Sequence, residues 1–124
     1  MSTLKVSEII ATGETAGRAV SGIAAAWVNF DGTGTVAIRD SVNVASLTDN
    51  STGNYSINFT NGMANNDFSP LCGASSFTNS SSDTFANAIV MATGYCTIQL
   101  VSSGTSNTYV DRTLVAAQVT GDLS

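Results

Sequence analysis

The sequence predicts an all-β protein: an antiparallel, jelly-roll-like β-sandwich with an irregular N-terminal arm. Three observations predict this fold class. Charged residues make up 10% of the 124 residues, against roughly a quarter in typical globular proteins. Ser, Thr, Asn and Gly must therefore supply much of the polar surface, and these residue types disfavour helices. From residue 25 onward, apolar and polar residues alternate in short segments, which turn-forming residues separate.

Residues 1–24 are expected to form an arm that is distinct from a β-sandwich domain at residues 25–124. The apolar residues of the arm begin with helical spacing, but Gly13, Gly17 and Gly22 interrupt it. We therefore expect an irregular segment with at most a short helix. Because the arm carries little charge to keep it solvated alone, we expect it to dock on another surface.

Two hairpins open the predicted sandwich. Tyr55, Ile57 and Phe59 alternate with polar residues, which predicts a strand with one buried face. Leu47 has the opposite parity from Val44, and we interpret this as a β-bulge; the alternative is that Leu47 belongs to the turn. The expected strands of the two hairpins are residues 27–30, 35–39, 42–48 and 54–60.

The residue pattern of the C-terminal half predicts four further strands. Residues 85–93 fit either a helix or a strand buried on both faces, and their short length and the following Gly94 favour a strand. Polar residues 78–84 and 102–107 are expected to form loops. The expected strands are residues 71–77, 85–93, 95–101 and 109–119. Many short strands and no long helix are typical of a sandwich.

Charge and composition argue against several classes of function. Four Lys and Arg against nine Asp and Glu give a net charge of −5, which is unsuited to nucleic-acid binding. The chain has no histidine, the usual general base and the commonest metal ligand. It shows neither a signal peptide nor the roughly 20-residue apolar stretch that a membrane helix needs. We expect no enzymatic activity, no nucleic-acid binding and no membrane insertion.

Residue patterns that resemble catalytic or metal-binding motifs have simpler structural interpretations. A weak resemblance to a calcium-binding loop is present at Asp49, Ser51 and Gly53. The segment has too few acidic ligands for calcium, so we expect a hairpin turn. The serines lack a histidine to activate them, and several aspartates occur where strands end and cap turns. Cys72 and Cys96 are expected to be small buried residues, although a disulfide between them stays open. We therefore expect no catalytic residues, metal or cofactor.

Residues 26–63 carry a resemblance to a known family. Its most specific elements are Trp-Val-Asn-Phe at 27–30, Gly-Thr-Gly at 32–34, Val-Ala-Ile-Arg at 36–39 and the hairpin turn at 48–53. This stretch resembles a domain of tail-fibre and other virion structural proteins of tailed bacteriophages, many of them marine or cyanobacterial. The arm segment at 4–9 is similar to the short leaders of such proteins.

The resemblance implies a structural protein without catalytic residues that is part of a virion assembled in the bacterial cytoplasm. It implies a homotrimer, a tail-fibre knob or head-fibre subunit, that contacts other phage proteins of the capsid or tail. Because the chain has no extended shaft, a capsid decoration (cement) protein is an alternative. The expected virion-docking and interface residues are Leu4, Val6, Ile9, Ile10 and Trp27.

A second alternative is a module that binds a host-surface glycan or receptor. Trp27 would suit a carbohydrate platform, but its place where arm and sandwich join favours an interface. In this alternative, exposed loops meet the host surface. The expected receptor-facing residues are Asp31, Thr33, Asn79, Ser81, Asp83, Thr105 and Asn107. An enzyme is a third alternative, which requires several carboxylates to converge in a cleft.

Overall fold

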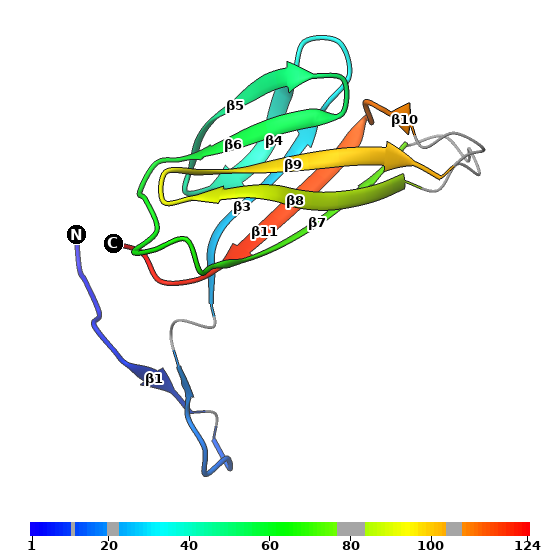
Figure 1. The fold of residues 1–124 in the computed structure, drawn as a ribbon. Coiled ribbons are helices and arrows are strands. Elements are labelled where there is room, and N and C mark those ends of the chain that lie inside the picture. Colours follow the sequence, from blue (N-terminus) through cyan, green and yellow to red (C-terminus); the bar gives the residue numbers. More distant parts are fainter. Residues whose placement is uncertain (11, 20–22, 77–83, 104–107) are drawn as a thin grey trace.

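The computed structural model describes residues 1–10, 12–19, 23–76, 84–103 and 108–124. Every regular element in these residues is a β-strand. Two antiparallel sheets pack face to face, and a small hairpin lies in the arm (Figure 1). The predicted all-β sandwich is confirmed. No helix in the described residues is long and apolar enough to cross a membrane.

The two layers of the sandwich differ in size. The four-stranded sheet has the order β4 (Ala37–Val42), β3 (Ala24–Asp31), β11 (Leu114–Thr120) and β7 (Ser69–Ser75). The five-stranded sheet has the order β10 (Thr108–Tyr109), β9 (Tyr95–Ser102), β6 (Asn54–Phe59) and β5 (Val44–Ser51), with β8 (Thr84–Ala92) paired to β9 on the side away from β6. Strands that are neighbours in a sheet are often distant in sequence, as β3 and β11 are.

The core lies between the sheets and comes from alternate residues of β3, β11, β6 and β9. In each strand one residue points into the core and the next points out, because successive side chains of a strand lie on opposite faces. The rings of Phe30 and Tyr55 meet edge to face with 5.2 Å between their centroids. The buried apolar side chains of these four strands are Ala25, Ala26, Val28, Phe30, Tyr55, Ile57, Phe59, Cys96, Ile98, Leu100, Val115, Ala117 and Val119, and Thr97 of β9 is buried as well.

The predicted bulge before Leu47 is present. The pairing of β5 with β6 shifts register between Val44 and Ser46. The extra residue on β5 changes the parity of the strand, so Val44 and Leu47 both pack against the core. The interpretation as a bulge, rather than as part of the turn, is confirmed.

Two expectations for the C-terminal half are wrong. Residues 109–119 do not form one strand: β10 ends at Tyr109 in one sheet and β11 begins at Leu114 in the other, because the chain crosses between the layers. Residues 84–92 form a strand, as expected, but it is not buried on both faces. It pairs with β9 and lies at the edge of its sheet, so Phe85 and Met91 are 58% and 44% exposed.

The arm contains a short hairpin and, in its described residues, no helix. β1 (Glu8–Ile9) pairs antiparallel with β2 (Arg18–Ala19). The reversal between them includes Gly13, whose φ of 93° lies in the region that favours glycine. Figure 1 shows this hairpin projecting away from the sandwich below the start of β3.

Asn43 holds the corner where the chain passes from β4 in one sheet to β5 in the other. Its φ of 57° is left-handed, a conformation that asparagine tolerates better than most residues. The Asn43 side-chain amide donates to the carbonyl oxygens of Ala25 and Asn61, both at 3.0 Å. Its Oδ1 accepts a hydrogen bond from the Asn61 backbone N–H at 2.7 Å. One side chain therefore ties together three segments that are distant in sequence.

We expect Asn43→Gly to lower the free energy of unfolding by about 2 kcal/mol, because glycine keeps the backbone conformation but loses three hydrogen bonds. Urea unfolding measures the change as a shift of the midpoint with an unchanged slope. Asn65→Gly, at an exposed loop asparagine, is the control and should change stability much less. Equal losses in both variants would show that the Asn43 side chain does not clamp the corner.

Candidate interaction surfaces

The N-terminal arm presents the first apolar surface. Leu4, Val6, Ile9 and Ile10 are 85%, 44%, 51% and 54% exposed. These are four of the five residues that the sequence predicts for docking, and the structure places them together on one short segment outside the sandwich (Figure 1). Burying a large aliphatic side chain contributes roughly 1.5–3 kcal/mol, so their exposure favours association with a partner surface.

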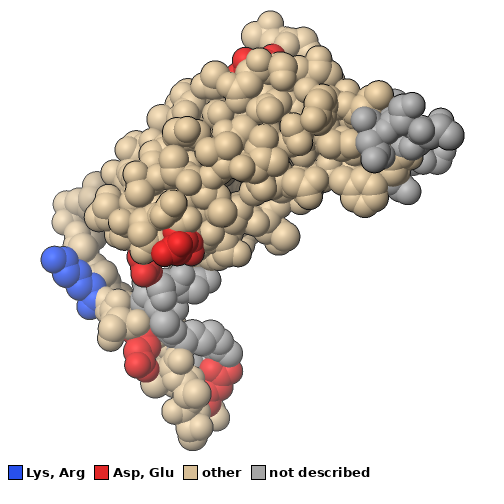
Figure 2. All heavy atoms as spheres, viewed as in Figure 1, with Lys and Arg blue, Asp and Glu red and all other residues tan. Residues whose placement is uncertain are grey.

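The edge strand β8 presents the second apolar surface. Its sequence contains no charged residue, and Phe85, Ile89, Val90 and Met91 are 41–58% exposed. The pairing of β8 with β9 shifts register between Ala88 and Val90, a bulge of the kind that protects sheet edges from unwanted strand addition. Figure 2 shows that uncharged residues dominate the visible face of the sandwich and that acidic side chains lie near its ends.

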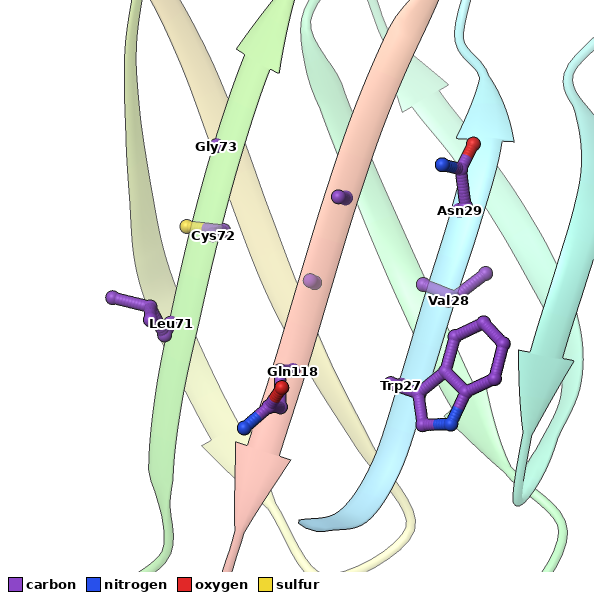
Figure 3. Close-up of a pocket in the computed structure, with 9 residues that line it drawn as sticks. Trp27, Val28, Asn29, Leu71, Cys72, Gly73 and Gln118 are labelled. Carbon is purple, nitrogen blue, oxygen red and sulfur yellow. The ribbon is translucent and has the colours of Figure 1, made fainter.

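Trp27, the fifth predicted docking residue, lies on a different surface. It belongs to β3, is partly buried and points to the outer face of the four-stranded sheet. There it lines a shallow hollow with residues of β7 and β11, not with the arm (Figure 3). The hollow has a volume of about 540 Å³. Its lining residues are Trp27, Val28, Asn29, Leu71, Cys72, Gly73, Ala116, Ala117 and Gln118.

At the loop that follows β3, the carboxylate of Asp31 forms hydrogen bonds with nearby residues. Asp31 Oδ1 accepts hydrogen bonds from the backbone N–H and the hydroxyl of Thr33, at 2.9 and 2.6 Å. The guanidinium of Arg39 lies 3.1 Å from Asp31 Oδ2. The Thr33 hydrogen bonds, with a smaller contribution from Arg39, lower the pKa of the Asp31 carboxyl. The other predicted receptor-facing residues lie outside the described residues: Asn79, Ser81, Asp83, Thr105 and Asn107.

A buried polar junction ties three loops at one end of the sandwich. The Tyr55 hydroxyl lies 2.8 Å from the Gly32 carbonyl oxygen and 2.5 Å from Asp111 Oδ1. Asp111 Oδ1 also accepts the backbone N–H of Gly53 at 2.8 Å. Burial, together with the hydrogen bond and charge of Asp111, raises the pKa of Tyr55 above its ordinary value. A tyrosine held in its neutral form beside a carboxylate that accepts hydrogen bonds serves to brace the loops.

The two cysteines do not pair with each other in the part of the chain that the structure describes. Cys72 and Cys96 are free thiols, the first partly buried and the second fully buried. Burial raises the pKa of both, which keeps them protonated near neutral pH. No group of three Cys, Asp or Glu side chains among the described residues is placed to hold a metal ion.

Sequence reasoning missed the residues that surround Trp27. Gln118 lies opposite Trp27 in the pairing of β11 with β3, and Leu71 lies opposite Gln118 in the pairing of β11 with β7. In the next row, Ala116 lies between Asn29 and Gly73. No local pattern marks these residues as neighbours, because they come from three strands and meet only through sheet pairing.

Comparison of the chain with protein-family models, curated proteins and solved structures finds no match. A function for this protein is therefore inferred from its own residues and surfaces. Three surfaces stand out among the described residues: the apolar arm, the uncharged edge strand β8 and the hollow beside Trp27.

Proposed function

We propose that this protein is a non-enzymatic structural subunit of a tailed-phage virion. It forms a homotrimer and attaches to the particle through its N-terminal arm. The observation that carries the proposal is the arm, which leaves the sandwich and exposes Leu4, Val6, Ile9 and Ile10. The resemblance of residues 26–63 to virion proteins supports the class of particle.

The composition of the sandwich supports assembly with other subunits. Strands β7, β8 and β9 contain no charged residue, and β8 exposes a row of large apolar side chains. Bringing a charge into an interface costs several kcal/mol when it is left unpaired, so an uncharged edge can be covered at low cost. Apolar groups covered in the same step add favourable free energy. We propose that β8 lies at the contact between subunits.

The attachment point is proposed as either of two places on the particle. A fibre or knob subunit would insert its arm into a tail or head protein, whereas a decoration protein would lay it on the capsid. Both use the same apolar arm residues. Labelled virions viewed by electron microscopy distinguish the two, because the label falls on the tail or on the capsid surface.

We expect the double substitution Ile9→Asp and Ile10→Asp to abolish attachment, because it places two charges on the proposed docking face. The measurement is the amount of protein that copurifies with particles assembled in cells supplying either form. The double substitution Thr3→Asp and Ser7→Asp is the matched control, since it adds the same charges at exposed polar positions of the arm.

The oligomeric state is measured on the same proteins by sedimentation. We expect the wild-type chain to sediment as a trimer and Phe85→Asp with Met91→Asp, on β8, to sediment as a monomer that is still folded. A monomeric wild-type chain would contradict the proposed trimer. An arm variant that stays on particles in stoichiometric amounts would contradict the proposed docking role.

A further inference from the structure

The hollow on the outer face of the four-stranded sheet has a floor of small residues and a wall of larger ones. Ala116 and Gly73 form adjacent positions of the floor, in register with Asn29. The neighbouring row consists of Trp27, Gln118 and Leu71, and their larger side chains form the wall along one side of the hollow. Figure 3 shows Trp27, Asn29 and Gln118 on one face of the sheet, with the indole rings turned to the viewer.

A second hollow adjoins the first. It has a volume of about 250 Å³ and shares Asn29, Gly73 and Ala116 with its neighbour. Leu114 and Ser75 line its far side. The two hollows share lining residues and form one groove across β3, β11 and β7.

Gly73 keeps this groove open without a structural requirement for glycine. Its φ is not left-handed, and a Cβ atom built on it would meet no heavy atom within 4 Å. A larger residue would therefore fit the strand, and β-strands are weakened by glycine in their interior. Glycine inside a strand marks a bulge, a bend or a site where a ligand or another backbone approaches closely, and the pairing of Gly73 with Ala116 shows no bulge.

The polar groups of the groove are uncharged and have capacity for further hydrogen bonds. The Gln118 amide and the Trp27 indole N–H form no hydrogen bond with the described residues. Asn29 Oδ1 accepts a long hydrogen bond of 3.4 Å from Arg39, which leaves its NH2 group as a donor. No charged residue lines either hollow, and Arg39, which reaches Asn29 from β4, is already paired with Asp31, so the groove offers no uncompensated charge to a phosphate, a carboxylate or a cation.

We propose that this groove binds a neutral saccharide. One sugar ring stacks its C–H face on the Trp27 indole, and its hydroxyls hydrogen-bond to the amides of Asn29 and Gln118. An amide presents a donor and an acceptor side by side, which matches neighbouring hydroxyl groups that both donate and accept. The next ring lies over Gly73 and Ala116. A proline-rich peptide also stacks on indoles, but it docks in grooves lined by several aromatic rings, and Trp27 is the one aromatic residue among these lining residues.

The inference goes beyond the proposed virion role and does not depend on it. It also differs from a receptor site on the loops, because every proposed contact lies on strands of one sheet. The arm substitutions Ile9→Asp and Ile10→Asp should leave saccharide binding unchanged. Failure of one proposal is therefore distinguishable from failure of the other.

A glycan array followed by fluorescence titration tests the proposal on the full chain. Trp27 is the single tryptophan of the sequence, so its emission reports directly on the groove. We expect neutral oligosaccharides from the array to give a saturable change in that emission. Calorimetry with the same oligosaccharides should show Trp27→Ala binding roughly tenfold more weakly or worse, since the loss of one stacking contact is worth about that factor.

The decisive pair of variants is Gly73→Leu and Gly94→Leu. Both add the same side chain where a Cβ atom meets nothing within 4 Å, and only Gly73 lies in the groove. We expect Gly73→Leu to remain folded and to lose saccharide binding, and Gly94→Leu to bind as the wild type does. Absence of a saturable response from every neutral glycan would overturn the proposal. Binding of a proline-rich peptide in place of a saccharide would also overturn it. A lower oligomeric mass of Gly73→Leu would do the same, because either result would show that the groove is a protein interface.

Discussion

Replacing Asp111 with alanine is expected to lower the free energy of unfolding by about 3 kcal/mol. Asp111 Oδ1 accepts the hydrogen bonds of the Tyr55 hydroxyl and of the Gly53 backbone N–H. Hydrogen bonds to a charged acceptor contribute about 1.5–3 kcal/mol each, and the Gly53 N–H would lose its acceptor. Urea unfolding at neutral pH measures the loss as a shift of the midpoint.

Two further variants separate the charge of Asp111 from its hydrogen bonds. Asp111→Asn keeps an acceptor oxygen and should recover part of the lost stability. Tyr55→Phe removes the other partner, so in a double-mutant cycle the losses of Tyr55→Phe and Asp111→Ala should not add. Additive losses would show that the 2.5 Å contact does not contribute to stability.

The same junction is crowded at Gly53. Its φ of 65° is left-handed, and a Cβ atom there would lie 2.7 Å from the Leu100 carbonyl oxygen and 2.8 Å from the Val110 backbone. The hairpin turn between β5 and β6 therefore packs against two other segments, and glycine permits the close approach. This packing places the Gly53 N–H beside Asp111.

Raising the pH from 9 to 11 is expected to lower the free energy of unfolding, with Cys96 as one cause. Burial, and to a smaller extent the nearby Cys72 thiol, raises the pKa of Cys96 from 9.0 to about 11. The unfolded chain therefore releases this proton at lower pH than the folded chain does, which favours unfolding as the pH rises. The stabilising contribution is complete below pH 9 and is lost as the pH approaches 11; it is on the order of 2–3 kcal/mol.

Urea unfolding in the presence of reductant, repeated across this pH range, measures the effect. Burial also raises the pKa of Tyr55, so a Cys96→Ala variant should keep part of the alkaline loss and lack the rest. Cys72→Ala removes the other, partly buried thiol, whose pKa burial also raises, and it should remove a smaller part of the alkaline loss than Cys96→Ala does. A Cys96→Ala variant with the full wild-type dependence would exclude Cys96 as a cause.

The two proposals assign different work to the two faces of the molecule. The uncharged edge at β8 and the apolar arm serve assembly, whereas the outer face of the four-stranded sheet serves saccharide binding. Such a division would let a subunit stay attached through its arm while the groove faces outward. The absence of charge from β8 and from the residues that line the groove follows from the same composition.

The sequence by itself determined most strands of the sandwich and the buried face of β6. Alternation at Tyr55, Ile57 and Phe59 predicted the buried face of β6, and the change of parity before Leu47 predicted the bulge in β5. These features are local, because side-chain direction in a strand alternates with every residue. The aliphatic residues of the arm were predicted as docking residues on other grounds, namely the low charge of the arm and its resemblance to the leaders of virion proteins.

Only the tertiary structure decided which strands lie at edges and which side chains meet. β8 has an apolar sequence typical of a buried strand, but it is exposed because it pairs with a single neighbour among the described residues. Tyr55 and Asp111 lie 56 residues apart, and Trp27 meets Gln118 and Leu71 through pairing of β3, β11 and β7. Strand order and register depend on long-range packing of the whole chain. The local alternation of apolar and polar residues does not reveal them.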